Sequence, residues 1–526
     1  MLPIVPFFFA PNILYAEIHY RFKYFFSFLF KSEPEILADA PYRIEPDKDL
    51  PILIFIKDAN LFPIDVLNVK IILSNNKGFK KEFTTSILKR IELSNWFYIY
   101  QIKFKSSDPF GFFNIDVKIE IKNKSKIKII SIDNYRTTNK SPLIVFRSKN
   151  KLPKLLNFKY GDIHSHSNYT HDQVEFGAPL EASQIISNAI GLSFFGATDH
   201  SYDLDDKIDN FLVNDDLLPK WNNFQTEVST LNKKNNFCTI IRGEEVSCSN
   251  SNGKNVHLLL LGNKNYFKGS GDGAEKWFRT KSEFTIEEIV SDISPDTIAI
   301  SAHPKEKIPF LHKLFFGRDT WSEFDLLNHK LTGMQILNGE INDSFFESKK
   351  IWIDLILNGQ KILIFAGNDA HGNFNRFRQL SIPFFKIVEK DFQLFGKMKT
   401  AVKSISKNEK DIIDSLKNNF SVITSGPLVD FSLSKNNILK YKILSTEEFG
   451  TISNLKIIFG DFDLQKETII FENNFKKKFS LQSSFKPKLK SKNGYYRIEV
   501  YTKNGIGNFK NNFCITNPIW TNENKN

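Results

Sequence analysis

LSFFGATDH, residues 192–200, decides the fold: an apolar run of strand length ends in Asp199 and His200, two residues of types that can take part in catalysis or metal binding. The same pattern recurs in IIRGEE (240–245), VHLLLLG (256–262), TIAISAHP (297–304), MQILNGE (334–340) and KILIFAGNDAH (361–371). Short apolar runs bounded by polar residues predict buried strands. The middle third of the chain is therefore expected to consist of strands whose ends carry functional groups.

Helical periods lie between these predicted strands. Pro179 can open a helix that Gly191 closes, and its common face is formed by Ala182, Ile185, Ile186 and Ala189. Strands that alternate with helices predict an α/β region with a parallel sheet or barrel.

The flanking regions have a different pattern, with β-branched and aromatic runs separated by turn residues and without helical periods. LPILIFI (50–56) and FFNIDVKIEI (112–121) are examples before the middle third, and YYRIEVYTK (495–503) is one after it. Such runs predict antiparallel strands. We therefore expect an N-terminal β-sandwich-like domain (1–150), a central domain (151–425) and a small C-terminal β-domain (426–526).

Composition agrees with several domains and limits the partners. The chain has 526 residues, more than the ~250–300 at which one core stops growing. Its 71 Lys and Arg against 59 Asp and Glu give a formal charge of +12, which favours anionic partners without identifying them, and among these we expect a small anionic substrate. Because the lysines are scattered, a solvated basic surface is favoured over a nucleic-acid-binding face. Composition leaves the oligomeric state open.

Cysteines and apolar segments predict the location. The three cysteines form no CxxC pair, which fits a reducing compartment, and we expect a cytoplasmic protein. The first sixteen residues are apolar but contain three prolines and lack a basic start, so they predict a buried strand rather than a cleaved signal. No apolar stretch of about 18 residues follows, so no membrane contact is expected.

Histidines and carboxylates gather at the predicted strand ends. His164 and His166 are two residues apart, so in a strand both imidazoles point to one face and can reach one ion. Six of the ten histidines lie near carboxylates at such ends. The candidate metal ligands are His164, His166, Asp172, His200, Glu245, His257, His303, Asp369 and His371. Mixed nitrogen and oxygen ligands favour Zn, Mn or Fe, and nine groups exceed what one ion needs, so we expect two or three divalent ions.

The order of these motifs resembles a known superfamily. DIHSHSNYTHD (162–172), GATDHS (196–201), RGEEVS (242–247) followed by VHLLLLG, SAHP (301–304) and GNDAHG (367–372) resemble the motifs of the polymerase-and-histidinol-phosphatase (PHP) metallohydrolases. The similarity covers residues 160–425. Within the superfamily, DQVEFGAP (172–179), QILNGE, GNDAHGNFNRFRQ and CITNPIW (514–520), with a β-domain on either side, resemble the carbaryl-hydrolase-like (CehA/McbA) subgroup.

The resemblance implies a distorted (β/α)7 barrel and a division of the ligands among three ions. His164 and His166 would bind one ion with Glu245 and Asp369, and Glu245 would bridge to a second ion held by His257 and His303. A third would be held by Asp172, His200 and His371. Many family members have histidine where Asp172 stands, so the third site departs from the family pattern.

Two carboxylates beside these motifs have other expected roles. Strand alternation lets only one of Glu244 and Glu245 face the site, and the family pattern selects Glu245. Asp199, next to His200, is expected to orient an imidazole.

The resemblance implies a metal-dependent phosphoesterase in which metal-activated hydroxide attacks a small phosphorylated substrate. Glu245, His200 and His371 are the candidate catalytic residues, with one of the histidines assisting the leaving group. Arg376 and Arg378 are candidates to bind the substrate's anion, and for each a structural ion pair is an equal alternative. Hydrolysis of a carboxylic ester, carbamate or amide at the same site is a second candidate function, and a non-enzymatic, metal-stabilised binding protein is a third.

Overall fold

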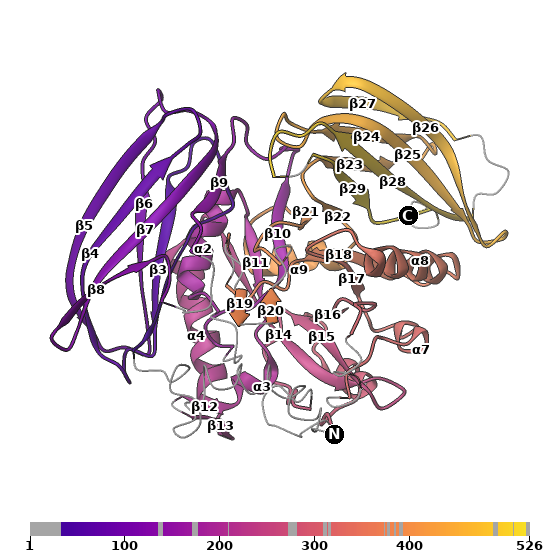
Figure 1. Ribbon diagram of the computed structural model, residues 1–526. Coiled ribbons are helices and arrows are strands. Elements are labelled where there is room, and N and C mark those ends of the chain that lie inside the picture. Colours follow the sequence, from indigo (N-terminus) through magenta and orange to yellow (C-terminus); the bar gives the residue numbers. More distant parts are fainter. Residues whose placement is uncertain are drawn as a thin grey trace, which may run out of the picture.

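The structure is a computed structural model (Figure 1). It describes residues 33–134, 140–170, 177–208, 210–271, 281–308, 313, 317–372, 374–375, 379–382, 385–388, 393–487, 493–508 and 510–521. The apolar start of the chain, for which a buried strand was predicted, lies outside the described residues.

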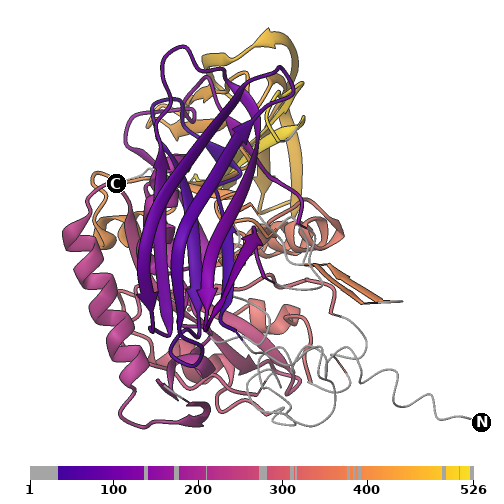
Figure 2. The same cartoon turned by 60° about the vertical axis from the view of Figure 1, so that its left-hand side comes forward.

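The N-terminal region, indigo in Figures 1 and 2, contains two sheets that share one core. One has the order β1-β3-β6 and consists of β1 (Glu35–Asp39), β3 (Leu50–Lys57) and β6 (Asn95–Ile102). The other has the order β2-β9-β7-β4-β5, with β8 also on β7, and consists of β2 (Arg43–Ile44), β4 (Ile64–Ser74), β5 (Lys80–Ile91), β7 (Gly111–Asn123), β8 (Lys126–Ser131) and β9 (Leu143–Arg147). Burial alternates along β4 and β7, because successive side chains of a strand point to opposite faces.

One sheet of 14 strands runs through the central and C-terminal regions in the order β18-β17-β16-β15-β14-β11-β10-β21-β22-β29-β28-β25-β26, with β30 on β28. Its central strands are β10 (Phe158–Ser165), β11 (Phe194–Ala197), β14 (Thr239–Ser249), β15 (Asn255–Leu261), β16 (Ile298–Ser301), β17 (Gly333–Asn338), β18 (Leu363–Gly367), β21 (Lys399–Lys403) and β22 (Ser421–Thr424). The C-terminal strands of this sheet are β25 (Thr451–Asp461), β26 (Lys466–Lys478), β28 (Gly494–Lys503), β29 (Asn512–Thr516) and β30 (Ile519–Trp520). A separate sheet, β23-β24-β27, lies beside them and consists of β23 (Leu428–Leu433), β24 (Leu439–Leu444) and β27 (Ser480–Phe485).

The predicted (β/α)7 barrel is wrong. The large sheet is mixed: β10, β11 and β14 are parallel, and so are β16, β17 and β18, but β15 runs antiparallel to both of its neighbours and β21 runs antiparallel to β10. Among the described strands the hydrogen-bonded order is open, with β18 at one end, and it continues into the C-terminal region instead of closing on itself.

A short loop explains the error. β14 ends at Ser249 and β15 begins at Asn255, so five residues join them, including a glycine, Gly253, with φ of 69°. A parallel crossover needs about a dozen residues or more, so this connection allows only an antiparallel hairpin. The Asn-Gly pair in the loop is a hairpin signal that the β-α-β interpretation overlooked.

The open end of the sheet still curls towards β10. A single isolated bridge joins Ser165 to Ala370, with hydrogen bonds from the His166 N–H to the Ala370 carbonyl (2.9 Å) and from the Asp369 N–H to the His164 carbonyl (3.0 Å). The residues that follow β18 are therefore fixed beside the end of β10. This contact positions the candidate site.

The helices of the described residues are α2 (Leu180–Ile190), α3 (Ser201–Leu204), α4 (Pro219–Lys234), α5 (Ile286–Asp292), α7 (Glu323–Leu326), α8 (Asp343–Leu357) and α9 (Glu409–Lys417). The helix predicted between Pro179 and Gly191 is confirmed: Pro179 is the N-cap of α2, and Gly191 is its left-handed C-cap with φ of 90°. None of these helices has both the length and the apolar character that a membrane crossing requires.

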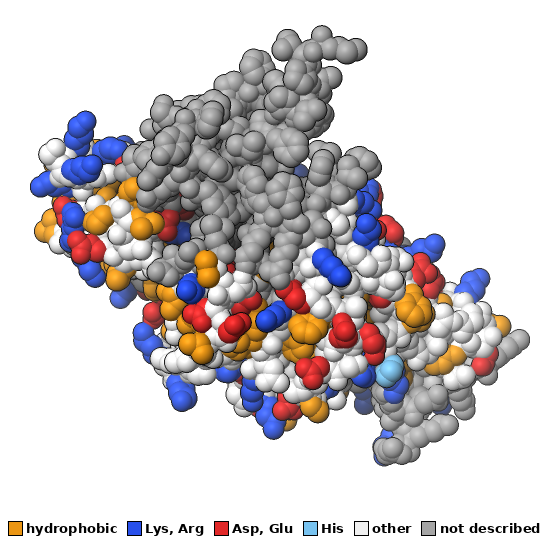
Figure 3. Space-filling model, turned by 90° about the horizontal axis from the view of Figure 1, so that it is seen from below, with side chains coloured by type: hydrophobic (Ala, Val, Ile, Leu, Met, Phe, Trp, Pro, Cys, Tyr) orange, Lys and Arg blue, Asp and Glu red, His pale blue; other side chains and the backbone are white. Residues whose placement is uncertain are grey.

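Two surface features complete the description. The short strands β12 (Asp206–Lys207) and β13 (Asn210–Asn214) pair near α4, and β19 (Gln379–Ile382) and β20 (Phe385–Val388) form a hairpin that projects from the body in Figure 2. On the face in Figure 3, acidic and basic side chains are interspersed over the part that the structure describes.

Candidate metal centre

Eight of the nine predicted ligands are described, and the structure brings them together. They come from the ends of β10, β11, β16 and β18 and from the paired strands β14 and β15: His164, His166, His200, Glu245, His257, His303, Asp369 and His371. All have low solvent exposure. The ninth, Asp172, lies outside the described residues, as do the predicted substrate residues Arg376 and Arg378.

Four ligand atoms from β10, β14 and the segment after β18 surround one point. His164 Nε2 lies 3.2 Å from His166 Nε2 and 3.4 Å from Glu245 Oε2. Asp369 Oδ1 lies 3.2 Å from His164 Nε2 and 3.1 Å from His166 Nε2. His166 Nε2 is 3.3 Å from Glu245 Oε2. Ligands at about 2.0–2.1 Å from one tetrahedral ion lie about 3.3–3.4 Å apart, so these separations are close to the edges of such a tetrahedron.

Glu245 extends the group in two further directions. Its Oε1 lies 2.8 Å from His257 Nδ1 and 3.4 Å from His303 Nε2, and its Oε2 lies 3.1 Å from His200 Nδ1. His200, Glu245 and His257 form a second set of possible ligands with atoms close enough for one ion. The central position of Glu245 suits a carboxylate that bridges two ions.

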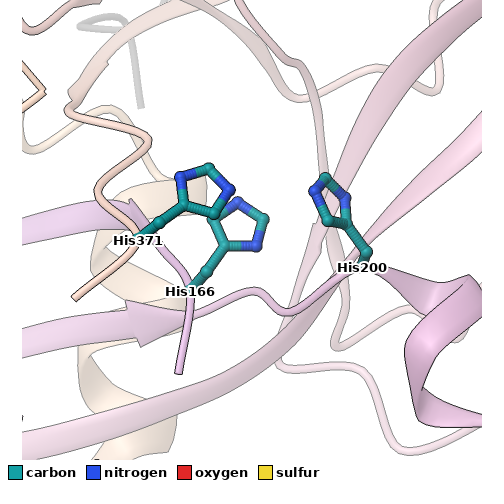
Figure 4. A group of neighbouring side chains, drawn as sticks. All are labelled: His166, His200 and His371. Atoms are coloured by element: carbon teal, nitrogen blue, oxygen red, sulfur yellow. The ribbon is translucent and has the colours of Figure 1, made fainter. Parts of the chain in front are cut away.

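Three imidazoles form another set (Figure 4). His166, His200 and His371 come from three separate segments, and their rings lie around a common space. The His166 and His371 rings stack at 4.0 Å with an angle of 3° between their planes, and the His166 and His200 rings are 4.4 Å apart. The resemblance grouped Asp172 with His200 and His371; among the described residues, His166 completes this set.

Glu306 is a possible ligand that sequence reasoning missed. It forms a set with His303 and Asp369, and its Oε2 lies 3.3 Å from His303 Nδ1. The resemblance placed His303 with His257 and Glu245 instead, and the 3.4 Å distance to Glu245 keeps that arrangement open. The position of Glu306, three residues after the histidine of SAHP, is the sequence signal that could have identified it as a possible ligand.

Polar neighbours fix the histidine rings. Gln335 Oε1 lies 2.8 Å from His164 Nδ1, which directs His164 Nε2 into the site. Asp199 accepts hydrogen bonds from the Thr170 hydroxyl (2.9 Å) and the Ser167 N–H (2.7 Å), and the Thr170 hydroxyl lies 3.3 Å from His166 Nδ1. Asp199 thus acts on an imidazole through Thr170, and that imidazole is His166. Such outer contacts set the tautomer and orientation of a ligating histidine.

The backbone is constrained at the same place. His303 has φ of 27° and Asp369 has φ of 51°, values that non-glycine residues adopt at a cost and that cluster at functional sites. Gly367 lies so close to β10 that an added Cβ would be 2.7 Å from the Cβ of His164 and 2.9 Å from Gln335 Nε2. Only glycine lets β18 approach the ligand histidine this closely.

The acid–base properties of these groups follow from burial and mutual charge. Burial opposes ionisation of Glu245, but His257 and His164 outweigh it and hold its pKa well below the usual range. Burial, together with the charge of His166, lowers the pKa of His200 to about 4. Burial lowers the pKa of His303, but Glu245 and Glu306 outweigh it and raise the pKa to about 9. The cluster therefore holds ionised carboxylates that attract cations, and an ion must displace protons to bind some of its histidines.

Two buried atoms test whether the residues fit a metal. His200 Nδ1 and Glu245 Oε2 lie 3.1 Å apart, yet neither forms a hydrogen bond in the described structure. A buried carboxylate oxygen without a hydrogen bond is costly unless a cation compensates it. Together with the 3.1–3.4 Å separations of the ligand atoms, this shows that the buried histidines and carboxylates could bind a metal ion.

The adjacent Glu244 has a different environment. It is fully buried on the opposite face of β14, where it accepts hydrogen bonds from the Ser201 hydroxyl (2.9 Å) and the Phe267 N–H (3.3 Å). Burial raises the pKa of Glu244 to about 8. Of the two adjacent glutamates, only Glu245 faces the histidines.

A cavity of about 280 Å³ opens onto the cluster. Its wall includes His200, Glu245, His257, His303, Asp369 and His371. Arg318 also lines the cavity, next to His257: its Nη2 is 3.3 Å from His257 Nε2. Lys305, close to His303 in the sequence, donates to the Trp321 carbonyl (2.8 Å).

No protein-family model matches the chain, and no curated protein matches it either. Solved structures give weak likenesses. A β-D-mannosidase from Dictyoglomus thermophilum is 12% identical, with 89% of this chain and 65% of the mannosidase covered, at a TM-score of 0.19. A β-glucuronidase from Parabacteroides merdae is 11% identical, with 92% and 63% covered, at a TM-score of 0.15. The chain thus spans less than two thirds of either enzyme, and such low TM-scores do not indicate a shared fold.

Proposed function

We propose that this protein is a metal-dependent hydrolase that acts as a phosphoesterase on a small phosphorylated substrate. The observation that carries the proposal is the group formed by His164, His166, Glu245 and Asp369 next to a cavity, in which five ligand-atom separations are 3.1–3.4 Å, as around one tetrahedral ion. Nitrogen and carboxylate ligands together favour Zn, Mn or Fe over Mg or Ca. The resemblance of the histidine motifs to PHP metallohydrolases supports the same activity.

The ligand sets account for more than one ion. Glu245 Oε2 lies beside His164 and His166, and Glu245 Oε1 lies beside His257. One carboxylate oxygen could therefore bind an ion with the first two histidines, and the other could bind a second ion with His257. Bound there, divalent ions would lower the pKa of a coordinated water and neutralise charge on the attacked ester.

The protein's own groups orient and enclose the reaction. Gln335 and Thr170 hold the rings of His164 and His166, so these ligands need little reorganisation. His371 lies at the cavity wall with its Nδ1 3.0 Å from the Asp369 carbonyl, which directs its Nε2 away from that carbonyl. His371 can thereby pass a proton to a leaving group in the cavity wherever it is not bound to metal. His200, whose pKa is about 4, is neutral near pH 7 and better suited to bind metal than to donate a proton.

The test is hydrolysis by metal-stripped protein reloaded with Zn or Mn. We expect release of p-nitrophenol from p-nitrophenyl phosphate that depends on the added metal and is lost in His164→Ala and His166→Ala. Release from p-nitrophenyl acetate alone would favour the carboxylic ester alternative. Metal binding without hydrolysis of either ester or of a phosphodiester would contradict the hydrolase proposal and favour a metal-stabilised binding protein.

A further inference from the structure

We infer that Arg318 and His257 form an oxyanion subsite that makes the cavity selective for phosphate monoesters. This inference rests on the proposed function, because it names the substrate class of that site. Arg318 Nη2 donates to His257 Nε2 (3.3 Å), and both residues line the cavity. The subsite thus adjoins the metal cluster directly.

The two nitrogens are donors once a cation occupies the cluster. His257 directs Nδ1 towards Glu245 Oε1 at 2.8 Å, so Nδ1 is the nitrogen that belongs to the ligand set. A neutral imidazole carries its proton on the other nitrogen, here Nε2. The guanidinium of Arg318 has donors and no acceptor. With a proton on Nε2, His257 would no longer accept from Arg318 Nη2, and the two N–H groups could share an acceptor, of which an anionic oxygen is the strongest.

Arg318 is held in place relative to His257. The Asn255 N–H donates to the Gly317 carbonyl (2.9 Å), and the Asp319 N–H donates to the Asn255 carbonyl (3.0 Å), so backbone bonds on both sides of Arg318 tie it to the start of β15. The indole N–H of Trp321 donates to the His257 carbonyl (3.1 Å). A cation fixed by its backbone loses little freedom when it binds, which favours affinity.

The chemistry of the subsite favours a monoester over the alternatives. A phosphate monoester has three terminal oxygens, so two can face the ions at Glu245 while the third meets Arg318 and His257. A diester has only two such oxygens, and a neutral carboxylic ester brings no anion for the guanidinium. A planar guanidinium suits a phosphate group in particular. The volume of about 280 Å³ fits a small monoester.

The experiment compares three p-nitrophenyl substrates and phosphate binding in metal-loaded protein. Arg318→Gln should raise KM for p-nitrophenyl phosphate and weaken binding of inorganic phosphate, measured by calorimetry, each by about 10- to 100-fold. Arg318→Lys keeps the positive charge but loses the planar guanidinium with its several N–H donors. Its KM and phosphate affinity should lie between those of Arg318→Gln and the wild type. The diester bis(p-nitrophenyl) phosphate and p-nitrophenyl acetate should change by less than about threefold.

Arg90→Gln is the matched control, because Arg90 is an exposed arginine on β5, in the N-terminal region. It should leave KM and phosphate affinity unchanged. Metal content, measured by elemental analysis, should be the same in all variants, which separates substrate binding from damage to the cluster.

The outcomes separate the subsite from the hydrolase proposal. Phosphate binding that depends on Arg318 without hydrolysis of any ester would support the subsite and contradict the hydrolase. Hydrolysis of p-nitrophenyl phosphate with the same KM and phosphate affinity in both Arg318 variants would overturn the subsite and leave the hydrolase standing. An equal loss on all three substrates with reduced metal content would also overturn it, because Arg318 would then support only the structure of the cluster.

Discussion

Two buried groups of charged residues in this molecule satisfy their charges in opposite ways. In the Arg43 cluster, Arg43 donates to both oxygens of Glu448 (2.7 and 2.8 Å) and to Glu45 (3.0 Å), so each of these donors meets an acceptor. In the metal centre, imidazole nitrogens and carboxylate oxygens face one another at 3.1–3.4 Å, and the Glu245 Oε2 atom has no hydrogen bond. The comparison shows that the Arg43 donors are matched by acceptors within the protein, whereas the candidate metal centre keeps a buried carboxylate oxygen without a hydrogen bond, which a bound cation would compensate.

The largest expected effect comes from removing the central acceptor of the metal centre. Glu245→Gln keeps the shape but removes the charge and one metal-binding oxygen. Metal affinity should fall by more than about 100-fold, because losing a residue that only hydrogen-bonds to a metal ligand typically costs about 10- to 100-fold. Elemental analysis after dialysis against a metal buffer measures this. Glu244→Gln, on the opposite face of β14, is the matched control and should keep its metal; full occupancy in Glu245→Gln would contradict the bridging role.

Breaking the Arg43 cluster should affect stability instead of metal binding. Arg43→Met leaves Glu448 and Glu45 buried without their cation and should lower the free energy of unfolding by about 3–5 kcal/mol. Urea unfolding measures the loss, and the metal content of the folded fraction should not change. Arg90→Met, which removes an exposed pair with Asp65, should cost at most about 1 kcal/mol. Equal losses in the two variants would remove the distinction between buried and exposed pairs.

A smaller effect on metal affinity is expected from removing Gln335, which hydrogen-bonds to the ligand histidine His164. Gln335→Met keeps the side-chain length but removes the acceptor for His164 Nδ1, so metal affinity should fall by about 10- to 100-fold. Titration of metal-free protein with Zn measures the change. Gln482→Met, at an exposed position of β27, should bind Zn like the wild type. Unaltered affinity in Gln335→Met would mean that β10 alone orients His164.

The smallest effect per step of the experiment concerns pH and involves Lys399, which lines a small cavity with Arg43 and Glu448. Burial, aided by Arg43, lowers the pKa of Lys399 to about 7, while an unfolded lysine keeps its ordinary pKa near 10.5. Between these values the unfolded chain holds the extra proton, so the free energy of unfolding should rise with pH from about 7 towards 10. The slope is at most about 1.4 kcal/mol per pH unit. Urea unfolding at pH 7, 8 and 9 should show a flatter dependence in Lys399→Met, and parallel curves would contradict the lowered pKa.

The sequence predicted which side chains gather at the site better than it predicted the sheet that holds them. The family pattern was needed to choose Glu245 over Glu244. Strand alternation, by contrast, was enough to place His164 and His166 on one face, because side-chain direction in a strand is a local property. Strand direction is not: the β14–β15 hairpin was mistaken for a crossover, although its loop has only five residues. The barrel prediction failed at this connection.

Other site residues could not be found from the sequence because their roles depend on distant partners. Gln335 is 171 residues from His164, and Arg318 is 61 residues from His257. A glutamine or an arginine has no strand-end pattern that distinguishes it from a surface residue. Only the folded arrangement shows that these side chains touch the metal ligands.

The β14–β15 hairpin also sets the order in which the metal centre can assemble. Glu245 and His257 are 12 residues apart and meet through a short loop, so their encounter costs little chain entropy and can occur early in folding. Asp369 must join His166 across 203 residues, so we expect this contact, and the ligand set that depends on it, to form late in folding. In refolding experiments, uptake of a tightly bound ion would therefore mark the last steps of folding rather than the first.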